Sequence, residues 1–297
     1  MISIEAHVAN LVFRLLPHDK EGEVHDYVAE RRRNDIRPPK LPKGVALDEF
    51  DLNGHIAEKI TKKGNDRGLL FFIHGGGFTT GSAKERRIFT YYAVDHFGYD
   101  CISINYRLAP ENRWPAQIED CYLAYENVLK MGYDPGTIVF AGESAGGTAV
   151  LSLALLAKKR GLPLPKAILA FSPCTDQYRD LPSHRNNIET DYMLKDAVAK
   201  GLFDVLLKEG EDRKALMDPL LSPYYGDYDG IPPIFLSVSD SETLCDDTLV
   251  LYDKLKKQGH RVQLVIEHGL CHAYPILPYM PEARKTLEKA FAFADKI

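Results

Sequence analysis

The chain lacks an uninterrupted apolar run of membrane-spanning length and has no excess of positive charge. A spanning helix needs about 20 consecutive apolar residues, so the sequence predicts no membrane span. Lysine and arginine total 37 against 42 aspartates and glutamates, and this net charge of −5 does not favour nucleic-acid binding. The basic run Arg31–Arg33 is flanked by Glu30 and Asp35, which is typical of a solvated helix end.

Cysteine is also scarce, and no Cys-x-x-Cys pair occurs. A dispersed set of odd number suits a reducing compartment better than a disulfide framework. The first residues show no basic stretch followed by a long apolar stretch and a small-residue cleavage site, so we expect no signal peptide and a cytoplasmic protein. No motif in the sequence indicates a cofactor site, and we expect no cofactor. The five cysteines are Cys101, Cys121, Cys174, Cys245 and Cys271.

Short apolar runs alternate with longer helical patterns from about residue 69 onward. This alternation predicts a mostly parallel sheet with helices on both faces, and 297 residues fit one α/β domain over 1–297. The stretch 45–60 adds a hairpin that turns at Asn53-Gly54. The expected strands are 69–73, 101–105, 137–141, 166–171, 234–238 and 261–266, and the expected helices are 83–97, 115–131, 145–160, 246–258 and 282–296.

Two segments, about 1–44 and 173–232, do not fit the alternation. The first contains an amphipathic helix, and the second a helical stretch from 194 to 208. We expect both to form a cap over the carboxyl edge of the sheet, where open α/β folds bind ligands. A membrane-surface helix is the alternative for the first, but its polar face is not strongly basic. Its apolar face carries Val8, Leu11, Val12, Leu15 and Leu16.

Ser144 lies in a Gly-Glu-Ser-Ala-Gly run, between the apolar run 137–141 and an alanine- and leucine-rich helical run. A Gly-x-Ser-x-Gly where a strand turns sharply into a helix is the nucleophile elbow, which presents the serine hydroxyl at the top of a sheet. Glycines at 142 and 146 suit a tight turn that has no room for a Cβ atom. A helix start with a small capping residue is the alternative explanation.

The run His-Gly-Gly-Gly from His74 to Gly77 follows the expected strand 69–73 directly. Successive glycines let backbone N–H groups turn toward a ligand, and in acyl transfer they receive the oxyanion together with the N–H of the residue after the nucleophile, here Ala145. A flexible turn or a phosphate cradle is the alternative. The run lacks a Gly-Lys-Ser/Thr ending, which argues against a P-loop.

A serine nucleophile needs a histidine base, and this layout places it on a loop after a late strand. His272 follows the expected strand 261–266, with His268 as a competitor nearer the strand end. A zinc site using His268, Cys271 and His272 is a further alternative. Gly269 disfavours a helix that would bring the histidines to one face, and no His-Glu-x-x-His occurs, so we expect no metal.

The acid that orients the histidine should follow the strand 234–238. Four carboxylates compete there, and Asp246 and Asp247 fit the first turn of the next helix, where they favour its dipole. Asp240 and Glu242 remain, and spacing alone does not separate them.

With these residues in place, the chain resembles the hormone-sensitive lipase family of α/β-hydrolase carboxylesterases. The resemblance covers nearly the whole chain, and its most specific part is the Tyr-Arg-Leu-Ala-Pro-Glu run at 106–111. It implies an α/β-hydrolase fold with a helical cap. The other motifs that carry it are the run 74–77, Trp-Pro-Ala at 114–116, Gly-Glu-Ser-Ala-Gly-Gly at 142–147, Asp-Pro-Leu-Leu-Ser-Pro at 218–223 and the late acid and histidine loops.

The resemblance also implies roles for single residues. The family's oxyanion hole maps onto Gly76, Gly77 and Ala145, and its histidine maps onto His272. Its acid loop, usually Asp-Pro-Leu-x-Asp-Glu, aligns so that Glu242 takes the acid position, with Asp240 as the alternative. The chain departs from the family pattern at 242 and at 143, where it has glutamate and many relatives have aspartate.

The predicted function is a serine esterase that hydrolyses carboxylic esters of short acyl chains through an acyl-enzyme. An amide or formamide hydrolase with the same residues is one alternative, and a non-catalytic small-molecule receptor on this fold is another. The expected partner is a small ester substrate, and a homodimer is compatible with the sequence, which specifies no interface for one.

Overall fold

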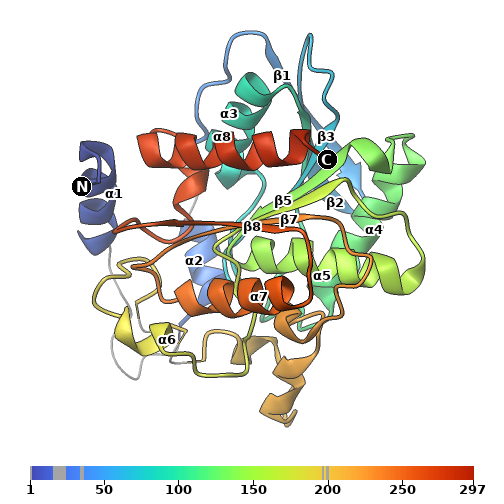
Figure 1. Ribbon diagram of the computed structural model, residues 1–297. Helices are drawn as coiled ribbons and strands as arrows, with labels where there is room; N and C mark the ends of the chain where they lie inside the picture. Colours follow the sequence, from blue (N-terminus) through green and yellow to red (C-terminus); the bar gives the residue numbers. More distant parts are fainter. Residues whose placement is uncertain (1, 16–24, 34–36, 196, 199–200) are drawn as a thin grey trace.

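The computed structural model describes residues 2–15, 25–33, 37–195, 197–198 and 201–297. Its strands form one eight-stranded sheet in the order β1-β2-β4-β3-β5-β6-β7-β8 (Figure 1). From β4 to β8 every neighbouring pair is parallel, as the alternating pattern predicts. The strands are β1 (Val45–Leu52), β2 (His55–Lys62), β3 (Leu69–Ile73), β4 (Asp100–Ile104), β5 (Ile138–Glu143), β6 (Ala167–Phe171), β7 (Ile234–Ser239) and β8 (Val262–Glu267).

The hairpin of β1 and β2 extends one edge of the sheet with antiparallel pairing. Leu52 pairs with His55, so the turn consists of Asn53 and Gly54 as the sequence predicts. Both turn residues have positive φ, 58° and 80°, which is the requirement of a tight hairpin turn and the reason for asparagine followed by glycine.

Helices cover both faces of the sheet, with α3 and α8 on one face and α4, α5 and α7 on the other (Figure 1). Successive strand residues point to opposite faces. Leu70 and Phe72 of β3 therefore pack with α3 and α8, while Phe71 and Ile73 pack with α4 and α5. These helices are α3 (Arg87–Phe97), α4 (Ala116–Lys130), α5 (Ala145–Arg160), α7 (Cys245–Lys257) and α8 (Pro281–Asp295).

The N-terminal helix α1 (Ile4–Leu15) packs through its small residues. Ala6 and Ala9 are buried against Leu270, Tyr274 and their neighbours, and the Asn10 amide donates to the Gly269 carbonyl (2.9 Å). The large apolar side chains predicted to share one face are more than half exposed, and Leu16 lies outside the described residues. These exposed side chains are Val8, Leu11, Val12 and Leu15. A second short helix, α2 (Tyr27–Arg33), follows.

In the described part of the segment between β6 and β7 there is one short helix, α6 (Ser183–Asn186). The helical stretch expected over 194–208 is not continuous, because its described part forms turns and a 3₁₀ turn. Gly201 has a φ of 82°, and the Leu202 N–H bonds to the Ala197 carbonyl in the pattern that ends helices. The 3₁₀ turns of the described chain are Lys84–Arg86, Pro135–Thr137, Asp204–Leu206, Arg213–Met217, Pro223–Tyr225 and Tyr274–Ile276.

None of the helices in the described ranges combines the length and the apolar character that crossing a bilayer requires.

Candidate functional site at the nucleophile elbow

Ser144 joins β5 to α5 in a single residue. Its φ of 56° and ψ of −125° are strained for a residue with a side chain, and its N–H is held by the Phe171 carbonyl (2.8 Å). A Cβ on Gly142 would lie 2.3 Å from the Gly146 carbonyl oxygen, and one on Gly146 would lie 2.1 Å from the Ile73 carbonyl oxygen. The glycines of the elbow are therefore required by close backbone packing.

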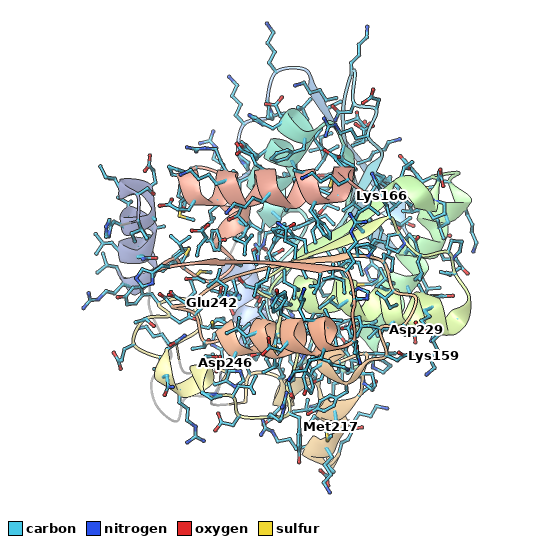
Figure 2. All side chains as sticks on the ribbon, in the orientation of Figure 1. Lys159, Lys166, Met217, Asp229, Glu242 and Asp246 are labelled. Atoms are coloured by element: carbon cyan, nitrogen blue, oxygen red, sulfur yellow. The ribbon has the colours of Figure 1, made fainter. Side chains whose placement is uncertain are left out.

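His272 and Glu242 form a buried pair. His272 Nδ1 contacts one carboxylate oxygen of Glu242, whose other oxygen accepts from the Ser239 N–H (2.6 Å) and the Ser172 hydroxyl (2.8 Å). Burial lowers the pKa of His272, but the adjacent Glu242 carboxylate outweighs it, and the pKa is raised above its ordinary value. Glu242 lies inside the protein, and Asp246 lies at the beginning of α7 (Figure 2). The arrangement fixes the imidazole ring with Nε2 directed away from Glu242.

Asp240 lies at a different place. Its carboxylate contacts His268 Nδ1 (2.6 Å) and accepts from the Gly269 N–H (3.1 Å), and both side chains of the His268–Asp240 pair are exposed. The structure thus brings Glu242 to His272 and Asp240 to His268. Among the described residues, no three histidine, cysteine, aspartate or glutamate side chains come together in a way that suits a metal ion.

The glycine run after β3 lines the same cavity as Ser144. Gly76 and Gly77 have φ of 108° and 62°, and within the described chain their N–H groups bond to no protein acceptor. Ala145, as the first residue of α5, has an N–H without an intrahelical acceptor. His74 is buried and stacks on Tyr106 (centroid distance 4.3 Å), and its pKa is lowered to about 3, chiefly by burial. His74 therefore stays neutral and holds the loop.

One cavity of about 530 Å³ joins these groups. Its wall includes Ser144, His272, Gly76 and Gly77. The rest of the wall comes from the N-terminal segment, the loop after β3, the 3₁₀ turn before α3, the end of β5, the insertion between β6 and β7, and the loops after β7 and β8. These lining residues are Phe13, His25, Tyr27, Glu30, Thr79, Thr80, Glu85, Arg86, Glu143, Met193, Leu194, Ala197, Leu202, Phe203, Leu244, Ala273 and Ile276.

Comparison with known proteins shows the family of the chain. A family profile described as the alpha/beta hydrolase fold matches residues 70–276, a span that contains the elbow, the glycine run and both late loops. The chain belongs to the α/β-hydrolase family.

Proteins to which the chain is similar are named as an acetyl-hydrolase and as esterases. An acetyl-hydrolase of Streptomyces hygroscopicus is 31% identical over 99% of this chain and 97% of its own length. Among solved structures, an esterase of the bacterial hormone-sensitive lipase family superposes with a TM-score of 0.87 at 28% identity, over 100% of this chain and 99% of that one. The esterase EstE5, soaked with p-nitrophenyl butyrate, gives 0.88 at 26% identity over 99% and 98%. By homology, the protein is an enzyme of the esterase class that resembles hormone-sensitive lipases.

Two buried carboxylates of this hydrolase have partners that the sequence does not indicate. Asp191 accepts from the N–H and the hydroxyl of Thr243 (2.8 and 2.9 Å), and so ties the cavity segment at Met193 to the loop of Glu242. Asp247 lies in the first turn of α7, as expected, but it is buried there and pairs with His184 (2.6 Å). Neither has a local sequence signal, because both partners lie more than 50 residues away.

The cavity wall includes the aromatic side chains of Phe13, Tyr27 and Phe203. Two aromatic residues close to the motifs make structural hydrogen bonds instead. Tyr274, after the histidine loop, bonds to Thr286 (2.8 Å), and the indole of Trp114 donates to Asp218 (3.2 Å).

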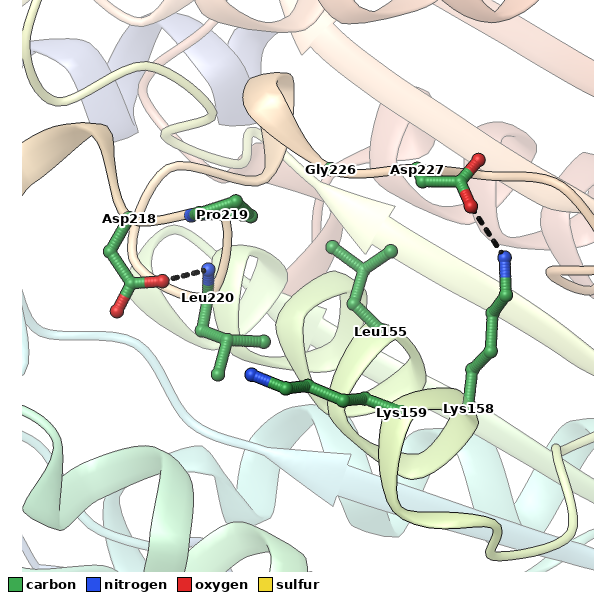
Figure 3. Close-up of a pocket in the computed structure, with 8 residues that line it drawn as sticks. All are labelled: Leu155, Lys158, Lys159, Asp218, Pro219, Leu220, Gly226 and Asp227. Atoms are coloured by element: carbon green, nitrogen blue, oxygen red, sulfur yellow. Dashed lines mark hydrogen bonds and ion pairs between the residues drawn. The ribbon is translucent and has the colours of Figure 1, made fainter.

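A second hollow lies beneath the Asp-Pro-Leu-Leu-Ser-Pro motif at the end of α5 (Figure 3). It encloses about 230 Å³, and none of the catalytic candidates reaches it. Two pairs of its polar groups bond to each other, Lys158 to Asp227 (2.8 Å) and the Leu220 N–H to Asp218 (2.9 Å). In this hydrolase the motif is thus accounted for by the packing of the loop against α5.

The elbow generates a matched test with two neighbouring glycines. We expect Gly146→Ala to lower the free energy of unfolding by at least about 2 kcal/mol, because its Cβ meets fixed backbone. Gly147→Ala should cost less than about 1 kcal/mol, since its Cβ lies 3.2 Å from its nearest neighbours and alanine favours a helix. Urea denaturation followed by circular dichroism measures both. Equal destabilisation by the two substitutions would contradict the packing argument.

Proposed function

We propose that the protein is a serine carboxylesterase that works through an acyl-enzyme on Ser144, with His272 as base and Glu242 as orienting acid. The observation that supports it most is the buried His272–Glu242 contact. It leaves His272 Nε2 without a hydrogen-bond partner within the described chain, in the wall of the cavity that Ser144 also lines. A histidine held in this way accepts a proton at Nε2 while the carboxylate stabilises the resulting cation.

The first step forms a bond between Ser144 Oγ and the ester carbonyl carbon, while the serine proton passes to His272 Nε2. The carbonyl electrons move to oxygen, and the N–H groups of Gly76, Gly77 and Ala145 stabilise the oxyanion. Collapse of this intermediate breaks the bond to the alcohol, which leaves with the proton from His272. Water then attacks the acyl-enzyme in the same manner, and releases the acid and Ser144.

Short acyl chains are the proposed substrate class. A cavity of about 530 Å³ suits a small ester, and several of its wall residues are apolar, such as Leu194, Leu202 and Phe203. The names of two relatives, an acetyl-hydrolase and an esterase soaked with p-nitrophenyl butyrate, support the same range. We infer that residues 1–44 and 173–232 act as the cap, since both contribute to the wall. Cytoplasmic localisation and dimerisation stay predictions.

A chain-length series tests the activity. We expect p-nitrophenyl acetate and butyrate to give the highest kcat/KM, with a fall for longer acyl chains and little turnover of matched anilides. Ser144→Ala is the blank and should lose about 10⁴-fold or more in kcat. Faster cleavage of anilides would favour the amidase alternative. Ligand binding without ester hydrolysis, unchanged in Ser144→Ala, would favour the receptor alternative.

The orienting acid is tested by two isosteric changes. Glu242→Gln should lower kcat about 10³- to 10⁴-fold, because the amide no longer stabilises the imidazolium. Asp240→Asn serves as the matched control, since its carboxylate contacts the exposed His268. It should leave kcat within about twofold of the original enzyme. A large loss in Asp240→Asn with little change in Glu242→Gln would reverse the assignment.

The pH profile reports His272. The base must be neutral in the free enzyme, so kcat/KM falls as the pH drops through the His272 pKa. Because Glu242 raises that pKa above its ordinary value of 6.5, we expect the acidic limb to have its midpoint above pH 6.5. Initial rates with p-nitrophenyl acetate in buffers of constant ionic strength measure it. A midpoint below 6.5 would exclude Glu242 as the dominant influence on His272.

A further inference from the structure

An ion pair inside the cavity has no part in the proposed mechanism. Arg86, at the end of the 3₁₀ turn Lys84–Arg86, donates through Nε to Oε1 of Glu143 (2.6 Å). The same oxygen accepts from the Gly75 N–H (2.6 Å), and Glu143 is only 1% exposed. One carboxylate oxygen thus links the start of α3, the elbow and the glycine run.

The carboxylate requires its cation. A buried unpaired carboxylate is strongly unfavourable, so the packing of Glu143 at this place depends on the contact with Arg86. Its second oxygen, Oε2, is buried and has no hydrogen-bond partner among the described residues, which leaves Arg86 and the Gly75 N–H as its compensation. The nearest other carboxylate to Arg86 is Glu85, at 3.6 Å from Nη1.

Gly75 has almost no freedom to move. A Cβ at this residue would lie 2.5 Å from the Glu143 carbonyl oxygen, 2.8 Å from its Oε1 and 2.9 Å from Ser144 Cβ. The peptide after Gly75 carries the N–H of Gly76, and the next carries that of Gly77. The direction of these two donors therefore depends on how the Gly75 N–H is held.

We propose that Arg86 is a positioning residue for the oxyanion loop, because it holds the Glu143 carboxylate on the Gly75 N–H and thereby sets the direction of the Gly76 and Gly77 donors. The proposal rests on the proposed esterase function. It also gives a role to the glutamate at 143, one methylene longer than the aspartate of many relatives.

The pair has a second, measurable consequence for His272. Its imidazolium is stabilised first by Glu242 and then by Asp191 and Glu143. Loss of the Glu143 charge should therefore lower the pKa of His272, and loss of the opposing Arg86 charge should raise it. His74 adds nothing to the profile, since its pKa is about 3. The other charged or titratable side chains of the cavity wall are His25, Tyr27, Glu30 and Glu85.

The experiment compares Arg86→Gln, Arg86→Lys and Glu143→Gln in the full chain with p-nitrophenyl butyrate. Arg86→Gln and Glu143→Gln should each lower kcat about 10- to 100-fold with KM within threefold, because a displaced donor weakens binding of the transition state and not of the ester. The acidic limb of kcat/KM should move to higher pH in Arg86→Gln and to lower pH in Glu143→Gln. Arg86→Lys keeps the positive charge, so the acidic limb of kcat/KM should have the same midpoint as in the unaltered enzyme. Its kcat should lie between that of Arg86→Gln and that of the unaltered enzyme.

Arg87→Gln is the matched control, because Arg87 pairs with Glu58 and Glu49 outside the cavity. It should lower the urea concentration at which half of the protein is unfolded, but leave kcat and the midpoint of the acidic limb unchanged. A trifluoromethyl ketone, which forms a hemiketal on Ser144, supplies a direct readout. Its Ki should rise in Arg86→Gln by the factor by which kcat/KM falls.

Several results would overturn the proposal while leaving the esterase function intact. These are a folded Arg86→Gln enzyme with unchanged kcat, a loss confined to KM, or limbs that move in the same direction in both glutamine variants. If Arg86→Gln does not fold, Arg86→Lys and Glu143→Gln decide: a partial loss of kcat in Arg86→Lys with a matching rise in ketone Ki supports the proposal, and unchanged kcat and Ki in both variants reject it. Absence of ester hydrolysis in the unaltered enzyme, in contrast, would reject the function itself.

Discussion

The turn from β5 into α5 at Ser144 is the constraint on which the rest of the site depends. A strand that becomes a helix within one residue forces that residue to a positive φ and brings neighbouring backbones into contact. The strain is maintained because the Ser144 N–H bonds to the Phe171 carbonyl of β6, and Gly146 packs against Ile73 of β3. The central strands of the sheet thus fix the elbow.

Buried carboxylates connect the loops that surround this turn. Glu143 holds the glycine run, Glu242 holds His272, and Asp191 holds the loop that carries Glu242. Each accepts at least one backbone N–H, which lowers the cost of burying a charge and orders the loop that donates it. These three buried carboxylates therefore order the site, and each of them fixes one segment of backbone.

The sequence predicted most of the fold, and particular elements show why. The parallel strands β3 to β8 are short apolar runs separated by helices, and the hairpin has asparagine and glycine where its turn needs positive φ. The prediction of a continuous helix over 194–208 was wrong. Its periodicity is helical, but Gly201 adopts a left-handed φ where the chain turns over the cavity.

Local chemistry by itself determined the elbow at Ser144, the glycine run and the late histidine loop, because each is a short motif directly after a strand. Only the tertiary structure decided which side chains of the site contact one another. Asp240 and Glu242 are two residues apart and equivalent on spacing, yet the loop after β7 turns one toward His268 and the other toward His272. The physical reason is that such pairs join segments from separate strands, whose separation in the sheet no local pattern records.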